Sequence, residues 1–543
     1  MKNNRPKKTG ATKFEHLCHE ASGHLDAGEY GDAEQKLSAA EGEFKKARLS
    51  SDAMSVSMLA CRMVDIGGES GNAELVRKGI KLFSSAVIGK YLDRGSLEYN
   101  LGNAKKSLYD IQRRDGSSSY NLEALPLLTE AKNHYWRAVQ HLSGHGLLKP
   151  QAFVNLANTL DQASRVVEAI HWYGEALKIK PGFGMALANR GDALMFLNNI
   201  SGGYSISLIV EALRCFEGAA NSPSTLPVVA ASARTKRETL ERFLREEHNW
   251  SEESHREDEA KTIAEADEHS VYWNYCLDNY VALSEHALYC RCAGARRDDL
   301  SILTSTRPLL GDFVPRCELL LNRIKSEFCM ARLLLFQGRT DAAHEPGLPE
   351  GFEGTYTELW EEESIGLRAE FLRTSFRLCF GILDRIAQGV NELFEIASQG
   401  EALYFDSFWR PRDQHKKGTE SRWEKLNRQD NLGLVALYSL ATDLDRRSGE
   451  FGFLKETRNH LEHGLLVILE EGADDLPETS RPMRIDVKTM GKEQFESLTL
   501  HLLQFTAAAI FSFVFAARIE ASKLETDEPS LTVTFLKKSV GKE

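Results

Sequence analysis

The sequence lacks the cysteine patterns that build disulfide frameworks or metal centres. Its 9 cysteines are odd in number and stand singly, without a CxxC pair or a Cys/His ligand spacing. The sequence therefore predicts reduced structural thiols in the cytoplasm, with no bound metal and no cofactor. We expect no secretory signal, because the basic MKNNRPKKTG is followed by the polar ATKFEHLCHE instead of an apolar run.

The chain also lacks an excess of positive charge. Its formal net charge is −12, so any contact with RNA must depend on a local basic surface. With 42% hydrophobic and 27% charged residues, the composition indicates an ordinary globular protein and excludes a disordered or fibrous one. Its 543 residues exceed what one hydrophobic core usually supports, so two or three domains are expected.

One apolar stretch bears on the expectation that the chain does not enter a membrane. Residues 497–517 carry no formal charge and are numerous enough to cross a bilayer. Polar residues interrupt the stretch, however, and charged residues flank it, which favours a helix buried in a bundle. The interrupting residues are Thr499, His501, Gln504, Thr506 and Ser512.

Helical periodicity dominates the chain, so the predicted fold class is all-α. A degenerate repeat in residues 1–225 has the tetratricopeptide pattern, with roughly four to six copies. The clearest copy comprises Phe153, Leu156, Ala157, Leu160, Ala169, Tyr173, Ala176 and Pro181. Its second-helix triplet recurs as Ala131/Tyr135/Ala138, as Ala212/Phe216/Ala219 and more loosely as Ala33/Leu37/Ala40, and Gly191 matches a small first-helix position.

Stacked helix pairs present a groove, so the repeats predict a surface for a protein or peptide partner. They could equally be a scaffold that holds another domain. Composition divides the rest of the chain into a helical linker or central domain (226–360), a helix-bundle domain (361–525) and a tail (526–543). Within the bundle we expect helices at 361–399, 426–449, 451–471 and 489–524.

The segment TRNHLEHGLL in the third bundle helix could carry chemistry. Asn459 and His463 share a helical face, and Arg458 stands five residues before His463. If RNA supplies its own 2′-hydroxyl as nucleophile, His463 can move protons and Arg458 can hold the phosphate. Asn459 can orient either partner, so no protein nucleophile or metal is required.

This spacing is weakly specific by itself, because other Arg and His residues have similar separations. They are Arg339/His344, Arg410/His415, Arg165/His171 and Arg242/His248. The alternative interpretation is an ion pair between Arg458 and Glu462 on a solvated helix, with His460 and His463 as ordinary surface residues.

The flanking segments make the pattern more specific. YWNYCLDN, MARLLLF, LDRIAQGVNELF, YFDSFW, LVALYSLATDL and RNHLEH follow in order over about 270–520, and together they resemble a bacterial HEPN family with N-terminal tetratricopeptide repeats. The resemblance implies a helical bundle that forms a homodimer and joins two Arg-x4–6-His motifs in one RNA-cleaving cleft. Arg458, Asn459 and His463 match that motif.

The resemblance further implies a metal-independent endoribonuclease that acts as a toxin or an antiviral effector, with the repeats as its sensor. The alternative is a non-catalytic interaction or scaffold protein. No phosphate-binding GxxxxGK[ST] loop is present, so the trigger and energy source stay unassigned. The basic segment 410–428 is either the RNA-backbone contact or a solvated loop. Its candidate residues are Arg410, Arg412, Lys416 and Lys417, with Trp409 and Trp423 available for base stacking.

Overall fold

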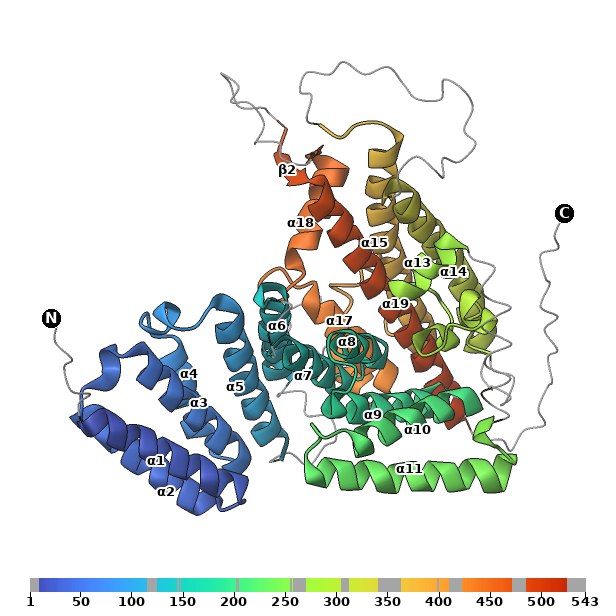
Figure 1. Ribbon diagram of the computed structural model, residues 1–543. Helices are drawn as coiled ribbons and strands as arrows, with labels where there is room; N and C mark the ends of the chain where they lie inside the picture. The colour runs from blue at the N-terminus through green and yellow to red at the C-terminus, as the bar shows by residue number, and fades with distance from the viewer. Residues whose placement is uncertain are drawn as a thin grey trace. The chain divides into compact units, whose positions relative to one another are not determined.

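The computed structural model describes residues 9–114, 125–143, 146, 148–201, 205–253, 256, 270–303, 312–339, 363–397, 400–409, 422–470 and 485–524. The predicted tail at 526–543 lies outside these residues. The described chain is helical apart from two short strands, which confirms the predicted all-α class (Figure 1). It forms two compact units, an N-terminal unit (1–163, 172–189 and 221–226) and a C-terminal unit (164–171, 190–220 and 227–543).

The first ten helices follow the chain as five pairs, which agrees with the predicted repeat number. The pairs are α1/α2 (Thr9–Asp26, Tyr30–Lys46), α3/α4 (Ala53–Ser70, Ala73–Phe83), α5/α6 (Arg94–Arg114, Leu125–His141), α7/α8 (Leu148–Gln162, Val166–Ile179) and α9/α10 (Gly184–Ile200, Ile206–Asn221). Every apolar position of the predicted repeat pattern is buried except Pro181, which follows the end of α8 and is exposed. A Cβ at Gly191 would lie 2.7 Å from Cε1 of Phe216, so this position must be small, as predicted.

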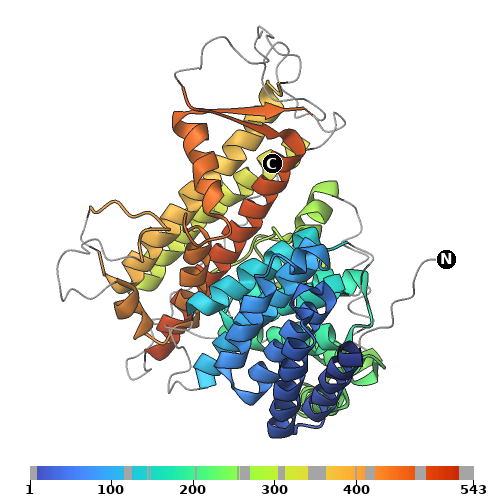
Figure 2. The ribbon, with the colours of Figure 1, turned by 90° about the vertical axis from the view of Figure 1, so that its left-hand side faces the viewer.

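Helix α11 (Pro227–His248) follows the pairs, and the C-terminal unit continues as a bundle built around α19 (Lys492–Lys523). The other elements are α13 (Val271–Asp278), η3 (Glu285–Leu288), η4 (Ala293–Arg296), α14 (Phe313–Arg339), α15 (Leu367–Phe394), α16 (Arg422–Asn427), α17 (Leu432–Asp443) and α18 (Gly452–His463). Helices α14, α15 and α17 pack against α19, and Figure 2 shows α15 and α19 running side by side.

Helix α19 contains the apolar stretch found in the sequence. Among the described residues it is the helix that is long and apolar enough to cross a membrane, but 83% of its most apolar window is buried inside the protein. Glycines allow its neighbours to approach closely: a Cβ at Gly389 would lie 2.6 Å from the Phe513 ring, and one at Gly433 would lie closer still to the Ala516 backbone. The prediction of a helix buried in a bundle is confirmed.

The prediction that the third bundle helix runs to residue 471 is wrong. Helix α18 ends at His463, and residues after Gly464 form strand β1 (Leu465–Leu469), paired in parallel with β2 (Val487–Gly491). A Cβ at Gly464 would lie 2.7 Å from the Asp486 carbonyl oxygen, so glycine is the residue that fits between the end of α18 and β1. The LLVIL segment is apolar throughout, and periodicity alone does not separate a short buried strand from a buried helix.

Burial inside the C-terminal unit gives stability a dependence on pH. His501 of α19 is half-buried, and its ring packs against the Phe451 ring with 4.8 Å between ring centroids. Burial, and then the nearby positive charges of His171 and Arg165, lower the pKa of His501 from 6.5 to about 3. The unfolded chain therefore binds a proton at His501 below pH 6.5, whereas the folded chain does so only near pH 3. Protonation favours unfolding in that window.

We expect His501 to lower the free energy of unfolding by about 1.4 kcal/mol for each pH unit below 6.5, or roughly 2 kcal/mol between pH 6.5 and 5. His501→Gln should flatten the pH dependence of the unfolding temperature in that range. His19→Gln, which alters an exposed histidine, should leave it unchanged. Equal slopes for both variants would contradict the assignment to His501.

Candidate active site on helix α18

Helix α18 is oriented by its buried side chains. Leu454, Thr457 and Leu461 face the interior of the C-terminal unit, where α18 packs against α15 and β1. At about 100° per residue, this leaves Asn459 and His463 on the opposite, exposed side of the helix. The apolar spacing of the segment thus determines which of its polar side chains reach solvent.

Arg458 lies at the edge between the buried and exposed sides. Its guanidinium carbon is 5.2 Å from the centroid of the Phe380 ring on α15. One guanidinium nitrogen, Nη2, is 3.8 Å from Oδ2 of Asp384, a distance at which the two groups form an ion pair without a hydrogen bond. The side chain is 34% exposed and makes no hydrogen bond with the described residues. Its N–H donors are therefore available to a phosphate.

The two histidines at the end of α18 differ in what they contact. Nδ1 of His460 lies 2.7 Å from the carbonyl oxygen of Glu456, and Nε2 lies 3.1 Å from Asp486. His463 is exposed, and within the described chain neither hydrogen bond nor ion pair engages it. His463 is thus the histidine whose ring nitrogens are free to exchange protons with a bound substrate.

The alternative ion pair between Arg458 and Glu462 does not form. Oε1 of Glu462 is 3.6 Å from Nε of Arg377 on α15, while Arg458 is paired with Asp384. Asn459 is exposed, and its amide makes no hydrogen bond to the part of the chain that the structure describes. Arg458 and His463 point about 140° apart around the helix, so they lie on neighbouring but distinct sides of it.

Helix α15 supplies groups that the sequence pattern did not single out. Arg377 donates a hydrogen bond of 2.7 Å to the Leu461 carbonyl oxygen, and Arg373 donates one of 3.3 Å to that of Leu466. Arg385 donates to Glu327 at 2.8 Å. The spacing of these arginines, four and eight residues apart, places them on one helical face and was visible in the sequence.

Asp384, the ion-pair partner of Arg458, is mostly buried. Burial raises the pKa of its carboxyl group, although a 2.9 Å hydrogen bond from the Phe405 amide and the charges of Arg458 and Lys455 oppose that rise. Lys455 is itself paired with Asp406. Asp384 therefore restricts where the Arg458 guanidinium can lie without forming a direct hydrogen bond to it.

The segment predicted to contact the RNA backbone, 410–428, lies mostly outside the described residues. Arg410, Arg412, Lys416 and Lys417 lie outside the described residues, as does the side chain of Trp423. The prediction that Trp409 is available for base stacking is wrong. Trp409 is only 2% exposed and packs edge-to-face against Phe405, Phe408 and Tyr438, because this apolar segment is part of the core.

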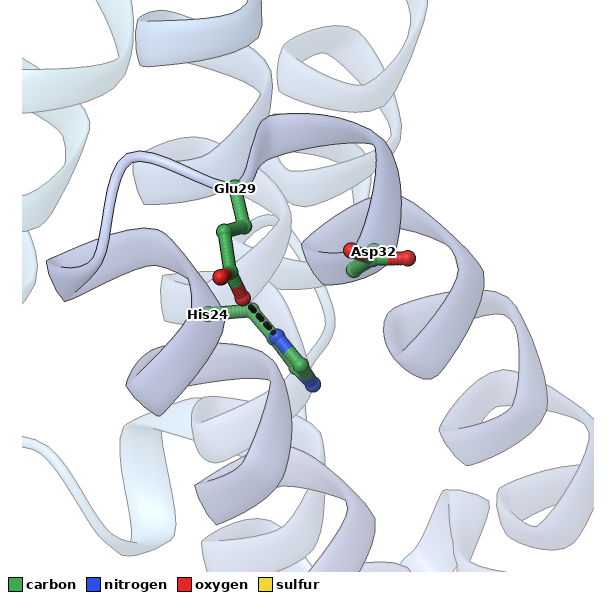
Figure 3. A group of neighbouring side chains, drawn as sticks. All are labelled: His24, Glu29 and Asp32. Carbon is green, nitrogen blue, oxygen red and sulfur yellow. Dashed lines mark hydrogen bonds and ion pairs between the residues drawn. The ribbon is translucent and has the colours of Figure 1, made fainter.

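One group of potential metal ligands occurs among the described residues, in the N-terminal unit. His24, Glu29 and Asp32 offer ligand atoms within 4.8 Å of one another. Figure 3 shows Glu29 pointing to His24, and their 2.6 Å contact accounts for much of the grouping, while Asp32 is joined to neither. Glu29 and Asp32 are exposed, so the group gives no reason to infer a bound metal.

Comparison with protein families identifies the domain that contains α18. Residues 311–520 match the family described as LA2681-like HEPN. The chain carries an LA2681-like HEPN domain. The match begins before residue 361, the start expected from the sequence, and includes α14, which packs against α15 and α19. The HEPN domain indicates a nuclease-like function, and α18 lies within the matched residues.

Other comparisons add less. No curated protein sequence matches the chain. A solved structure described as the TPR2AB-domain:pHSP90-complex of yeast Sti1 is 16% identical over 42% of this chain and 85% of that chain, with a TM-score of 0.18. The tetratricopeptide-like array is established by its own helix pairs and buried positions.

Proposed function

We propose that the HEPN domain is a metal-independent endoribonuclease whose catalytic residues are Arg458, Asn459 and His463. The observation that carries the proposal is that one helix of this domain presents a guanidinium without hydrogen bonds and an exposed imidazole without a partner in the described chain. Uncommitted N–H donors beside an imidazole that can accept and donate protons are what cleavage of a phosphodiester requires.

In the proposed reaction the RNA 2′-hydroxyl attacks the adjacent phosphorus. His463 accepts the hydroxyl proton or donates one to the leaving 5′-oxygen. Arg458 binds the phosphate through two N–H groups and stabilises the charge that develops on its oxygens. The exposed Asn459 amide orients the phosphate or the histidine. A cyclic phosphate and a free 5′-hydroxyl result, and the atoms balance without a co-reactant.

The cleft is proposed to form between two copies of the chain. The Arg458 side chain lies against the Phe380 ring of α15, whereas His463 lies about 140° away around α18. Within one chain the two side chains therefore point in different directions. A two-fold interface across the exposed side of α18 would bring His463 of each copy toward Arg458 of the other. A cytoplasmic enzyme of this kind would act as a toxin or an antiviral effector, controlled through the repeats.

The test uses the purified full chain with a fluorescent single-stranded RNA in EDTA. We expect cleavage that leaves 2′,3′-cyclic phosphate ends, and no cleavage of the same RNA with 2′-deoxy sugars, because the nucleophile is then missing. Products with 3′-hydroxyl ends would contradict the mechanism. An intact RNA under all conditions, including added divalent cations, would favour the alternative of a non-catalytic interaction protein.

A further inference from the structure

One aromatic side chain between α15 and α17 is exposed in a segment whose other aromatic rings are buried. Within residues 400–409, Phe405, Phe408 and Trp409 are at most 2% exposed, whereas Tyr404 is 51% exposed. The Tyr404 hydroxyl group makes no hydrogen bond, and its ring makes no ring contact, with the residues that the structure describes. Because single exposed apolar side chains are common, the surroundings of Tyr404 decide whether it binds a ligand.

The backbone of Tyr404 is held on both sides of its carbonyl group. The carbonyl oxygen accepts hydrogen bonds of 3.2 Å from the Ser407 amide and 2.8 Å from the Phe408 amide. The next amide along the chain, that of Phe405, donates to Oδ1 of Asp384 at 2.9 Å. The ring can therefore turn only about its own two side-chain torsions, so little conformational entropy is lost when a ligand packs on it.

The carboxylate of Asp384 connects this segment to the candidate active site. Its other oxygen, Oδ2, lies 3.8 Å from Nη2 of Arg458, whose N–H groups make no hydrogen bond with the described residues. Lys455, one turn before Arg458 on α18, is paired with Asp406, which holds α18 against the same segment. Tyr404 therefore lies near the guanidinium that is proposed to bind phosphate.

The other cations described around this segment are engaged within the protein. Lys455 is neutralised by Asp406, and Arg422 is neutralised by Glu401. A ligand bound here thus gains affinity from an aromatic ring as well as from the phosphate contact of Arg458. A nucleotide offers both in one unit, since its base has an apolar face and its phosphate accepts hydrogen bonds from a guanidinium.

We propose that Tyr404 stacks on an unpaired base next to the phosphate that Arg458 binds, and so selects single-stranded RNA. This inference rests on the proposed function, because it assigns the kind of RNA that the same site accepts. In a duplex both faces of a base are covered by its neighbours, so only a base from a single strand, loop or bulge can lie against the ring. Every base has such a face, so the stacking tolerates all four bases.

Binding can be measured apart from cleavage with a fluorescent dodecamer of 2′-O-methyl RNA, which lacks the 2′-hydroxyl nucleophile. Fluorescence anisotropy with the full chain in EDTA gives its dissociation constant. Tyr404→Ala should weaken binding about 5- to 100-fold, the range expected for the loss of one stacked base. Tyr404→Phe keeps the ring and should bind like the unaltered chain, because the hydroxyl group has no partner to lose in the described chain.

Tyr91 provides a matched control. It is 53% exposed and belongs to the N-terminal unit, so Tyr91→Ala should bind like the unaltered chain. The salt dependence of binding separates stacking from charge. Tyr404→Ala should leave the slope of log affinity against log salt concentration unchanged, whereas Arg458→Ala should reduce it by about 0.7, the value for one phosphate contact on a single strand.

The same dodecamer annealed to its complement should bind more weakly than the single strand. Equal binding of the duplex, no binding of the single strand by the unaltered chain, or equal affinities of Tyr404→Ala and Tyr91→Ala would each overturn the proposal.

Cleavable RNA distinguishes a failure of the stacking from a failure of the catalytic proposal. Tyr404→Ala should raise KM by a factor similar to its effect on binding and leave kcat within about twofold, because the base is stacked equally before and during the reaction. An unchanged KM would contradict the stacking while cleavage itself stands. Binding that depends on Tyr404 without any cleavage would support the stacking and contradict the catalytic proposal alone.

Discussion

Replacing His463 by alanine is expected to slow RNA cleavage by about 100- to 10,000-fold, the range that a positioned general acid or base contributes. The exposed ring of His463 has no hydrogen bond or ion pair to lose in the described chain, so the substitution should leave the unfolding temperature unchanged. The measurement is single-turnover cleavage of a fluorescent RNA, which reports the chemical step apart from product release.

His460 provides the matched control three residues away on the same helix. Its ring is engaged by the Glu456 carbonyl oxygen and by Asp486, so His460→Ala should retain cleavage and affect mainly the stability of α18. If His460→Ala and His463→Ala were equally inactive, the loss of cleavage would come from a disturbed α18 and not from the loss of the His463 imidazole. A fully active His463→Ala would remove the residue from the site.

A mixture of two inactive variants tests whether the cleft is shared. In a heterodimer of Arg458→Ala and His463→Ala, one copy still offers the guanidinium and the other still offers the imidazole. If the cleft takes these groups from different chains, copurified heterodimers should recover part of the activity that each homodimer lacks. No recovery in verified heterodimers would place both groups of a working cleft in one chain.

The sequence predicts those features of the fold that depend on residues close together in the chain. The buried alanines and tyrosines of the repeats follow a fixed spacing, and the motif of α18 lies within one helix, so both could be found from pattern alone. Their partners could not. Asp384 meets Arg458 only because α15 packs beside α18, and neither residue carries a local signal of the other.

The burial of Trp409 and the presence of strand β1 were predicted wrongly from the sequence. Both lie in apolar or mixed segments whose local pattern admits two environments, and the choice is made by packing with distant elements. The same holds for Asn103 and Asn158, which are ordinary polar helix residues in the sequence. Only the stacking of successive helix pairs brings a tyrosine hydroxyl group and the amide of a second asparagine to the Oδ1 atom of each.

The largest effect on stability is expected at Arg332, an arginine of α14 that is only 2% exposed. Its guanidinium donates hydrogen bonds to both carboxylate oxygens of Asp298, at 2.8 and 2.6 Å, and to the Tyr272 hydroxyl group and the Val281 carbonyl oxygen, each at 2.8 Å. Arg332→Met leaves the mostly buried Asp298 without its countercharge. Breaking a buried pair in this way costs about 3–5 kcal/mol.

Thermal unfolding of Arg332→Met and Arg291→Met compares a buried pair with an exposed one. Arg291 pairs with Asp278 at 2.6 Å, but the two side chains are 59% and 56% exposed, so its loss should cost a small fraction of the effect at Arg332. Adding Asp298→Asn to Arg332→Met removes the uncompensated charge and should recover part of the loss.

The stability effect of Arg332→Met also tests where the folded HEPN domain begins. All three lie between residues 272 and 298, before the family match begins at residue 311, yet Arg332 lies within that match. A large destabilisation by Arg332→Met would mean that residues 270–303 fold as part of the HEPN domain. A chain shortened to 311–520 would then lack the hydrogen-bond partners of the Arg332 guanidinium. Equal effects of Arg332→Met and Arg291→Met would instead place the boundary of the folding unit at the start of α14.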